Sequence, residues 1–355
     1  MSGISTNIGL LAVALLLGVS GAEAQPAPQR PAPLFDSDVP VQLRFAGDLR
    51  TLVNDRDSVE STWHPFTLTY RVGDEPPAVL DVKFRTRGHW RRQERNCVFP
   101  PLMLNVPEGK ARETLFADQD RLKLVTPCNP GTRDFREYVL REYLVYRAYN
   151  LLTPLSLRAR LATTTYVDTT GRMDSLTVQT FLLEDPAQMA ARNNGKRLDM
   201  QGAEFYHVDT LQMGLVGLFL YMAGATDWSL RGLHNIELVQ DTLQGAFMPV
   251  AYDFDFTGIV NTAYARPDPR LRIPSVRVRL YRGPCLSGEQ WQAVFTRFQE
   301  QRGSLYALYD TLPGLSSGYV KDTRRYLDEF FRVLDEPDRT SRELVRRCRS
   351  AEGTQ

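Results

Sequence analysis

Two polar stretches in the second half of the sequence hold residue types that could do chemistry together. GATDWSLRGLHNIELV contains Asp227, His234 and Asn235, and MPVAYDFDFTG contains Asp253 and Asp255. Each stretch follows an apolar run, so its polar groups are expected where a buried element ends. Two neighbouring carboxylates repel each other, and their burial requires a compensating cation. Hard oxygen ligands of this kind suit Mg²⁺ or Mn²⁺.

We interpret PVAYDFDF as a strand. Alternate side chains of a strand share a face, so Asp253 and Asp255 are expected on one face and Phe254 and Phe256 on the other. The apolar lead-in FMPVAY favours a metal site over solvated acids at an exposed strand end. Asn235 is a suitable uncharged ligand for a metal that already faces one or two carboxylates.

Asp227 is the candidate catalytic residue, because an Asp a few residues upstream of the ligands can orient a hydroxyl nucleophile or accept its proton. The structural alternatives are that Asp227 caps a turn and that His234 is a satisfied buried histidine. The presence of Asp253 further along the chain favours the functional interpretation.

A phosphoryl group in transfer needs a cation to neutralise its charge. Lys123, in RLKLV, is the first candidate, and Arg87, in RTRG, is its rival because a guanidinium fork matches phosphate geometry. Glu142 is the expected ion-pair partner of Lys123, with Glu137 as the alternative. A solvated strand lysine remains the structural alternative.

The elements that must position these residues change along the chain. Before about residue 184, short alternating runs bounded by Gly, Pro and Asp predict strands, with one amphipathic helix at TRDFREYVLREYLVYRAYNLL. After that point, VDTLQMGLVGLFLYMAGA predicts a buried helix, and amphipathic helical segments follow. The sequence predicts an α+β fold with a β-rich lobe over 34–184, an α-helical lobe over 185–350, and a ligand cleft between them.

The order GATD, HNIEL and PVAYDFD resembles the catalytic core of atypical kinases of the spore-coat protein H (CotH) type and, more distantly, of the HipA type. The resemblance implies a two-lobed kinase-like fold. It also implies that Asp227 is the catalytic residue, that Asn235 and Asp253 are metal ligands, and that Asp255 is the second acid of a D-x-D pair. KFRTRGHWRR and LEDPAQM are similar to the RGNSS region and the hinge strand of CotH proteins.

The sequence departs from this family pattern at three places. Asp227 and Asn235 are eight positions apart, whereas typical kinases keep about five. RGHWRR lacks the small polar residues of the CotH stretch, and no Gly-rich phosphate loop is present. Six arginines over 264–285 occupy the place of an activation segment, either to receive an acidic or phosphorylated substrate or as a solvated loop.

The N-terminus carries an export signal. The segment IGLLAVALLLGVSG is short for a membrane span and precedes Ala22-Glu23-Ala24, which predicts a signal peptide over 1–24, cut after Ala24, rather than a membrane anchor. A Pro-rich lead-in over 25–33 follows. We therefore expect a periplasmic or secreted protein with no stable membrane span. The net charge of +1 gives no reason to expect nucleic acid as a partner.

Four cysteines fit export, because disulfides persist in oxidising compartments. Two disulfides allow three connectivities, and proximity in sequence favours Cys97–Cys128 and Cys285–Cys348. A zinc site is the alternative, but no C-x-x-C motif is present.

Together these features predict an exported, metal-dependent kinase that transfers phosphate from a nucleoside triphosphate such as ATP to the hydroxyl of an unidentified protein or small molecule. Because the periplasm and the medium contain little ATP, a non-catalytic binding module (a pseudokinase of the envelope) is one alternative. A metal-dependent hydrolase, in which Asp253 and Asp255 activate water, is the other.

Overall fold

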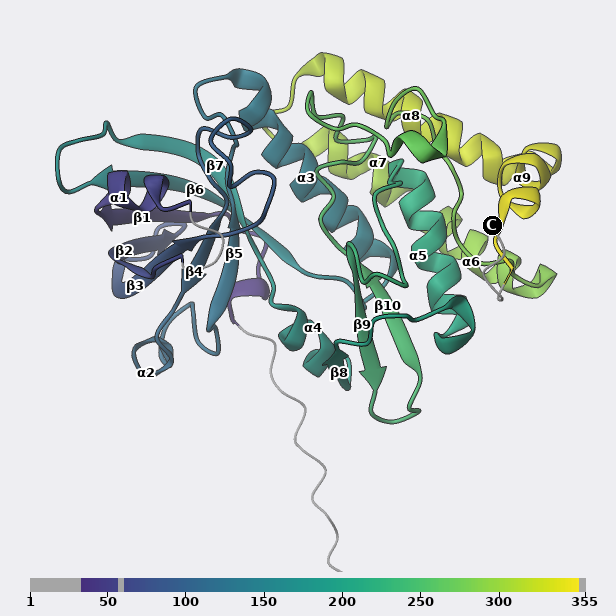
Figure 1. Cartoon of the computed structure of the whole chain (residues 1–355), viewed down its shortest axis with the longest axis horizontal. Coiled ribbons are helices and arrows are strands. Elements are labelled where there is room, and N and C mark those ends of the chain that lie inside the picture. Colours follow the sequence, from purple (N-terminus) through teal and green to yellow (C-terminus); the bar gives the residue numbers. More distant parts are fainter. Residues whose placement is uncertain (1–32, 57–60, 351–355) are drawn as a thin grey trace, which may run out of the picture.

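The computed structural model describes residues 33–56 and 61–350. The described residues begin with a β-rich part and end with a helical part that packs beside it (Figure 1). The predicted signal peptide and its cleavage site lie outside the described residues. Within the described ranges, no helix is both long enough and apolar enough to cross a bilayer.

The β-rich part is a closed barrel of seven strands in the order β1-β2-β3-β4-β5-β7-β6. All neighbours are antiparallel except β1 and β6, which are parallel. The strands are β1 (Val41–Gly47), β2 (His64–Val72), β3 (Ala78–Thr86), β4 (Leu102–Asn105), β5 (Arg121–Val125), β6 (Ala159–Asp168) and β7 (Leu176–Leu183).

The expected two-lobed kinase-like fold is wrong, because the β-rich part closes on itself. The register of β1 and β6 pairs Val41 with Ala162 and Gly47 with Asp168, so the first strand is joined to a strand far along the chain. The alternating sequence pattern predicts strands and their inward faces, but backbone pairing between distant strands leaves no such pattern.

The barrel interior is filled by the inward-facing residues of these strands. Leu43, Phe45, Leu68, Phe84 and Leu122 are all buried there. Phe45 and Phe84 meet edge to face, with their ring centroids 4.6 Å apart. Each such side chain stabilises the fold by about 1.5–3 kcal/mol on burial, so the barrel has a hydrophobic core of its own.

The rest of the chain is mainly helical and includes a small antiparallel sheet in the order β10-β9-β8. Helices α1 (Leu49–Asn54) and α2 (Glu108–Ala111) lie within the barrel part. The remaining elements are α3 (Arg133–Leu152), α4 (Pro186–Arg192), β8 (Gly195–Leu198), α5 (Thr210–Ala223), β9 (Ile236–Asp241), β10 (Phe247–Ala251), α6 (Gly288–Glu300), α7 (Arg302–Thr311), α8 (Ser317–Asp335) and α9 (Pro337–Glu343).

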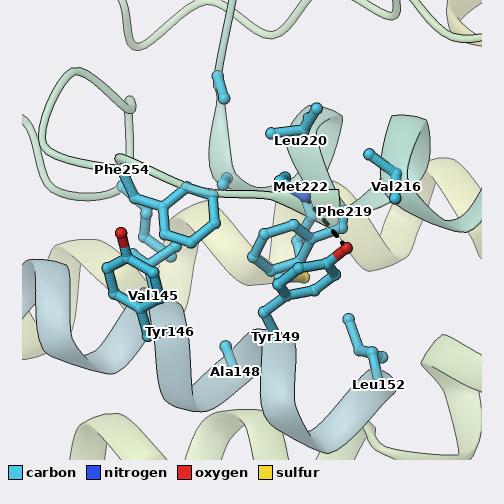
Figure 2. Packing of buried hydrophobic residues seen from close by; sticks show 14 of the residues in the cluster. Val145, Tyr146, Ala148, Tyr149, Leu152, Val216, Phe219, Leu220, Met222 and Phe254 are labelled. Atoms are coloured by element: carbon cyan, nitrogen blue, oxygen red, sulfur yellow. Dashed lines mark hydrogen bonds between the residues drawn. The ribbon is translucent and has the colours of Figure 1, made fainter. Parts of the chain in front are cut away.

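A second hydrophobic core joins α3, α5 and the chain after β10 (Figure 2). Tyr149 of α3 stacks on Phe219 of α5 with 4.3 Å between ring centroids. Tyr146 of α3 packs against Phe254 at 4.6 Å. Because Phe254 is buried between Asp253 and Asp255, this core fixes the position of the segment that carries both acids.

The predicted buried helix is confirmed as α5. Asp209 caps its first turn by accepting a hydrogen bond from the Gln212 N–H at 2.7 Å. Gly224 ends it with φ +71°, a left-handed conformation that favours glycine. A Cβ atom at Gly224 would also collide with the Tyr326 hydroxyl. The chain therefore turns sharply just before Asp227.

The two disulfides join the pairs that proximity in sequence favours, Cys97–Cys128 and Cys285–Cys348. Both are compatible with an extracellular or periplasmic location. The first links the loop between β3 and β4 to the start of the segment that leads into α3. The second links the chain before α6 to the chain after α9.

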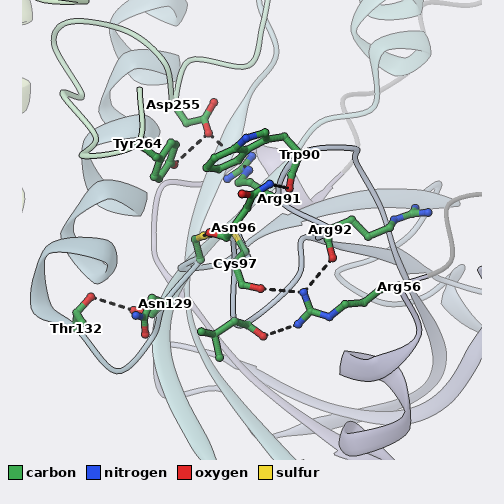
Figure 3. Close-up of a disulfide and its surroundings, with 12 residues drawn as sticks. Arg56, Trp90, Arg91, Arg92, Asn96, Cys97, Asn129, Thr132, Asp255 and Tyr264 are labelled. Carbon is green, nitrogen blue, oxygen red and sulfur yellow. Dashed lines mark hydrogen bonds and ion pairs between the residues drawn. A yellow bond between two sulfur atoms is a disulfide. The ribbon is translucent and has the colours of Figure 1, made fainter. Parts of the chain in front are cut away.

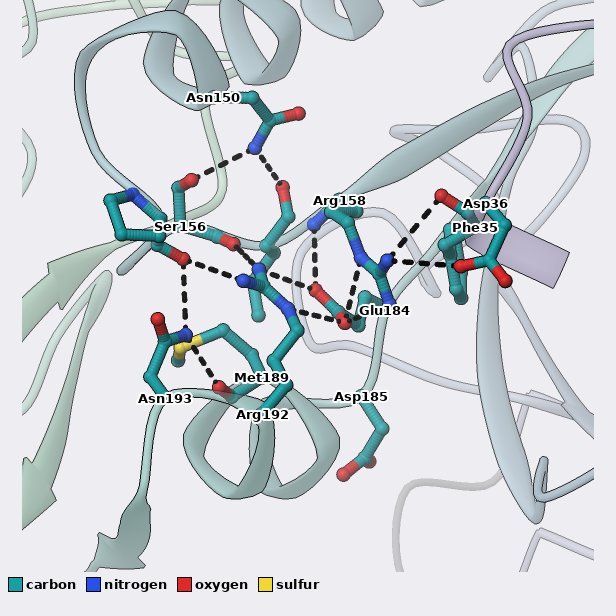
Figure 4. A network of polar contacts seen from close by, with 12 residues as sticks. Phe35, Asp36, Asn150, Ser156, Arg158, Glu184, Asp185, Met189, Arg192 and Asn193 are labelled. Atoms are coloured by element: carbon teal, nitrogen blue, oxygen red, sulfur yellow. Dashed lines mark hydrogen bonds and ion pairs between the residues drawn. The ribbon is translucent and has the colours of Figure 1, made fainter. Parts of the chain in front are cut away.

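A buried ionic network ties the end of β7 to α4 and to the chain before β6 (Figure 4). The Glu184 side chain is 0% exposed. It accepts hydrogen bonds from the Arg158 N–H at 2.9 Å, from Arg158 Nε at 3.0 Å and from Arg192 Nε at 2.9 Å. Arg158 also reaches Asp36 at 3.6 Å. The network holds the barrel against the helical part at the chain segment that joins them.

Replacing Glu184 by Gln is expected to destabilise the protein by about 3–5 kcal/mol, because it leaves Arg158 and Arg192 without their buried counter-charge. Urea unfolding of both proteins measures this difference. Glu75→Gln, in the exposed turn between β2 and β3, is the matched control and should change stability by less than about 0.5 kcal/mol. Equal loss in both variants would contradict a structural role for the Glu184 charge.

Candidate functional site

Asp253 lies just beyond β10, which ends at Ala251. The interpretation of PVAYDFDF as a continuous strand is therefore wrong. Asp253 has φ +62°, a left-handed conformation that Asp and Asn adopt more readily than other L-residues. Its N–H donates to Tyr146 Oη at 2.9 Å, so α3 holds this turn. The Asp253 side chain remains 45% exposed.

Asp255 is buried two residues further on, with a side chain that is 6% exposed. Its carboxylate accepts a hydrogen bond from Tyr264 Oη at 3.1 Å. Arg91 faces both acids. Its Nε lies 3.6 Å from Asp255 Oδ2 (Figure 3), and its Nη2 lies 3.9 Å from Asp253 Oδ1. Burial raises the pKa of Asp255 to about 6, while Arg91 opposes this shift and Asp253 adds to it.

Asp227 and Asn235 meet although they are eight positions apart. Asn235 Nδ2 donates to the Asp227 carbonyl oxygen at 2.7 Å. His234 Nε2 lies 3.0 Å from Asp227 Oδ1. Between them, Ser229 and His234 pair through two backbone hydrogen bonds of 2.9 Å, which closes a small loop. This loop accounts for most of the spacing between Asp227 and Asn235.

The two polar stretches lie side by side because β9 and β10 form an antiparallel pair. Their register places Ile236 opposite Ala251. The Tyr252 N–H donates to the Asn235 carbonyl oxygen at 3.1 Å, directly before Asp253. The hairpin therefore brings Asn235 next to the turn that presents the Asp253 carboxylate.

Lys123 lies in the middle of β5, between Met103 of β4 and Leu183 of β7. Its Nζ lies 4.8 Å from the centroid of the Tyr252 ring. Burial lowers the pKa of Lys123, and Arg87 lowers it further, while Asp253 opposes the shift. Lys123, which belongs to the barrel, and Asp253, which belongs to the helical part, therefore interact electrostatically.

Arg87 follows the end of β3, and its Nε donates to the Leu102 carbonyl oxygen at 3.1 Å. Burial lowers the pKa of Arg87, and Arg91 lowers it further, while Asp253 and Glu142 oppose the shift. Arg87 therefore belongs to the same group of charges as Asp253.

Glu142 is buried on α3, and its carboxyl group interacts electrostatically with Arg91 and Arg87. Burial raises the pKa of Glu142 to about 8; Asp255 adds to this shift, and Arg91 and Arg87 oppose it. In the described part of the chain, Glu142 forms no ion pair with Lys123.

Glu137, the alternative partner of Lys123, pairs instead with Arg141 on its own helix at 3.0 Å. Its carboxylate also accepts a hydrogen bond from Ser316 Oγ at 2.9 Å. Glu137 therefore joins α3 to the start of α8.

Comparison with known proteins does not assign this arrangement to a family. No family model matches the chain, and no curated protein matches it. What the residues can do must be argued from their geometry.

The carboxylate of Asp253 and the amide oxygen of Asn235 are oxygen donors of the kind that hard divalent cations prefer. Asp253 offers a half-exposed carboxylate whose one ion pair in the described residues is the 3.9 Å contact with Arg91. Because Asn235 Nδ2 donates to Asp227, its amide oxygen points away from that bond and can act as a ligand. Within 33–56 and 61–350, no three His, Cys, Asp or Glu side chains are grouped as a metal site. Mg²⁺ usually takes one or two carboxylates together with substrate phosphates, so Asp253, with Asn235 beside it, is the candidate residue to hold such an ion.

The arginines of 264–285 mostly bind the protein itself. Arg277 Nη1 donates to the Gly258 carbonyl oxygen at 2.9 Å, and Arg279 Nε donates to that of Met222 at 3.1 Å. Arg282 donates to the Trp228 carbonyl oxygen at 3.1 Å. These three arginines brace the chain around α5 and Asp227, a role that neither of the expected alternatives includes.

Arg91 and Tyr146 belong to the site but were not among the candidates. Tyr146 has no sequence signal beyond its place on the apolar stripe of α3. For Arg91 a signal exists: the run RTRGHWRR lies just before Cys97, whose partner Cys128 follows β5. A disulfide at that position implies that the arginine run lies close to the strand of Lys123.

Proposed function

We propose that this protein is a metal-dependent phosphotransferase that moves the terminal phosphoryl group of a nucleoside triphosphate to a hydroxyl acceptor. The observation that carries the proposal is the convergence of Asp227, Asn235 and Asp253 through the loop contact at 2.7 Å and the β9–β10 hairpin. Arg87 and Lys123, which belong to the barrel part, both interact electrostatically with Asp253.

This arrangement supplies what phosphoryl transfer requires, which is positioning and charge neutralisation more than covalent chemistry. Lys123 and Arg87 would hold phosphate oxygens, and Asp253 and Asn235 would hold Mg²⁺ or Mn²⁺, which neutralises charge on the phosphates. The half-exposed Asp227 carboxylate would orient the acceptor hydroxyl and accept its proton. Asp255, buried and bonded to Tyr264, would support the metal side of the site.

The likeness of GATD, HNIEL and PVAYDFD to CotH-type kinases supports the chemistry only. The fold expected from that likeness is replaced by a closed barrel with a helical part. We further propose that the protein works outside the cytoplasm, because two disulfides in one chain suit an oxidising compartment.

A non-catalytic nucleotide-binding module is the second candidate, and Arg91 favours it. Its guanidinium lies within 4 Å of both acids and supplies part of the positive charge that a metal would otherwise bring. A protein that only binds nucleotide phosphates could use this built-in cation.

Thermal unfolding of the mature protein, with its disulfides intact, tests the proposal. We expect little change with Mg²⁺ or ATP alone and a clear stabilisation with both, since a ligand at about 100 times its Kd stabilises a protein by about 2.7 kcal/mol. Transfer of a labelled terminal phosphoryl group is then measured. Transfer to hydroxyl acceptors supports the phosphotransferase, release to water alone favours a hydrolase, and binding without turnover favours the binding module. No stabilisation in any mixture contradicts the proposal.

A further inference from the structure

The loop between β3 and β4 (residues 87–101) is fixed to the barrel by covalent and polar contacts (Figure 3). Cys97 is disulfide-bonded to Cys128, and the Phe99 N–H donates to the Cys128 carbonyl oxygen at 3.0 Å. Arg56 donates to the carbonyl oxygens of Arg92, Cys97 and Val98 at 2.9, 2.8 and 2.6 Å. The three hydrogen bonds from the Arg56 guanidinium and the Cys97–Cys128 disulfide together fix the conformation of this loop.

The fixed loop places Trp90 and Arg91 against the segment that carries the acids. Trp90 packs over Phe256 and Tyr264, with ring centroids 6.1 and 5.3 Å apart. The Trp90 carbonyl oxygen accepts a hydrogen bond from Asn96 Nδ2 at 2.8 Å, one residue before Cys97. The disulfide end of the loop is thus connected to Trp90 and, through it, to Arg91.

The Arg91 guanidinium approaches both acids without a hydrogen bond to either in the described part of the chain. Its distances of 3.6 Å to Asp255 and 3.9 Å to Asp253 are ion-pair distances, beyond the range of a good N–H···O bond. The Arg91 side chain is 14% exposed. A nearly buried guanidinium with five N–H donors and no hydrogen-bonded acceptor has donors to offer to a ligand.

Two further cations, Arg87 and Lys123, lie near Arg91 and the acids. Burial lowers the pKa of Arg87, and Arg91 lowers it further; Arg87 in turn lowers that of Lys123. Arg87 and Arg91 of the loop and Lys123 of β5 therefore belong to one group of charges. The same group holds Asp255, Glu142 and Asp253, which raise the pKa of Arg91 against the effect of burial. Phosphate oxygens suit the planar fork of an arginine, and the N–H donors of Arg91 that make no hydrogen bond within the described residues can bind them.

We infer that Arg91 is a further phosphate-binding residue of this site, and that the Cys97–Cys128 disulfide and Arg56 position it. The inference rests on the proposed function for the identity of the ligand, a metal-bound polyphosphate. It assigns the first disulfide a role in ligand binding and leaves the second, Cys285–Cys348, with a role in stability alone.

The test measures binding of magnesium tripolyphosphate and of magnesium ATP by calorimetry. Arg91→Gln is expected to weaken both by about 10- to 100-fold, the loss expected for a charge-assisted hydrogen bond. Arg91→Lys, which keeps the charge, should recover part of this loss. Arg95→Gln, an exposed arginine of the same loop, is the matched control and should stay within about twofold of wild type.

The positioning role is tested by comparing the two disulfides. Cys97→Ser/Cys128→Ser is expected to weaken tripolyphosphate binding by about 2- to 10-fold, since the ligand must then order the loop. Cys285→Ser/Cys348→Ser should leave affinity unchanged. If the first double variant does not fold, Arg56→Lys, which loses the fork that joins three carbonyls, is expected to give the same weakening.

The outcomes separate this inference from the proposed function. Phosphate transfer by wild type with unchanged binding in Arg91→Gln overturns the inference alone. Tighter Mg²⁺ binding in Arg91→Gln with unchanged tripolyphosphate affinity also overturns it, because Arg91 would then compete with the metal. Arg91-dependent binding without any transfer supports the inference and contradicts the phosphotransferase. No binding of either probe to wild type contradicts both.

Discussion

Replacing Asp227 by Asn is expected to lower kcat for phosphate transfer by about 10²- to 10⁴-fold, the usual contribution of a positioned proton acceptor. The carboxylate is oriented by His234 Nε2 at 3.0 Å, and its main chain is held by Asn235 at 2.7 Å. Asn keeps the size of the side chain and can still pair with His234, but it cannot accept a proton. The effect should therefore appear in kcat, with the KM for magnesium ATP within about twofold of wild type.

The measurement is steady-state transfer at saturating magnesium ATP, together with urea unfolding of both proteins. Asp74→Asn, an exposed acid in the turn between β2 and β3, controls for the loss of one charge and should leave kcat unchanged. Full turnover in Asp227→Asn would remove Asp227 from the chemistry and leave it as a residue that shapes the loop up to Asn235.

The local elements of this fold could be predicted from the sequence because each has a local cause. The alternation in VQLRFAG appears as β1, with Val41, Leu43 and Phe45 directed into the barrel. The unbroken apolar run before Gly224 appears as α5. Closure of the barrel has no local cause, since it depends on which distant strands meet. The β1–β6 pairing therefore could not be read from either strand.

The site was predictable to the extent that its residues follow buried elements. Asp227 could be predicted because it comes shortly after the buried helix α5. Asn235 could be predicted because it directly precedes the strand β9. The left-handed turn at Asp253 was not predicted, because PVAYDFDF fits a strand pattern. In the structure β10 ends at Ala251, Asp253 has a positive φ, and Phe254 packs against Tyr146. Arg91 was missed because its sequence signal is indirect: the arginine run precedes Cys97, and only the pairing of Cys97 with Cys128 places that run near β5.

The left-handed turn also decides how Asp253 should be tested. Asn tolerates φ +62° at least as well as Asp, whereas Ala would add backbone strain to the loss of the carboxylate. Asp253→Asn therefore removes the charge and keeps the turn, including the N–H that donates to Tyr146. We expect the variant to fold with unchanged stability in the absence of ligand.

With Asp253→Asn, the affinity for Mg²⁺ in the presence of ATP is expected to fall by more than about 100-fold, since even residues that only orient a metal ligand are worth about 10- to 100-fold in metal affinity. A titration of Mg²⁺ at fixed ATP, followed by thermal unfolding, measures this change. Asp255→Asn should have a smaller effect, because Asp255 is buried against Tyr264 and Arg91 while Asp253 is half-exposed. If Asp253→Asn were still stabilised by Mg²⁺ and ATP together, the metal would have to bind somewhere other than this turn. If Asp255→Asn lost more Mg²⁺ affinity than Asp253→Asn, Asp255 would be the principal ligand and Asp253 would support it.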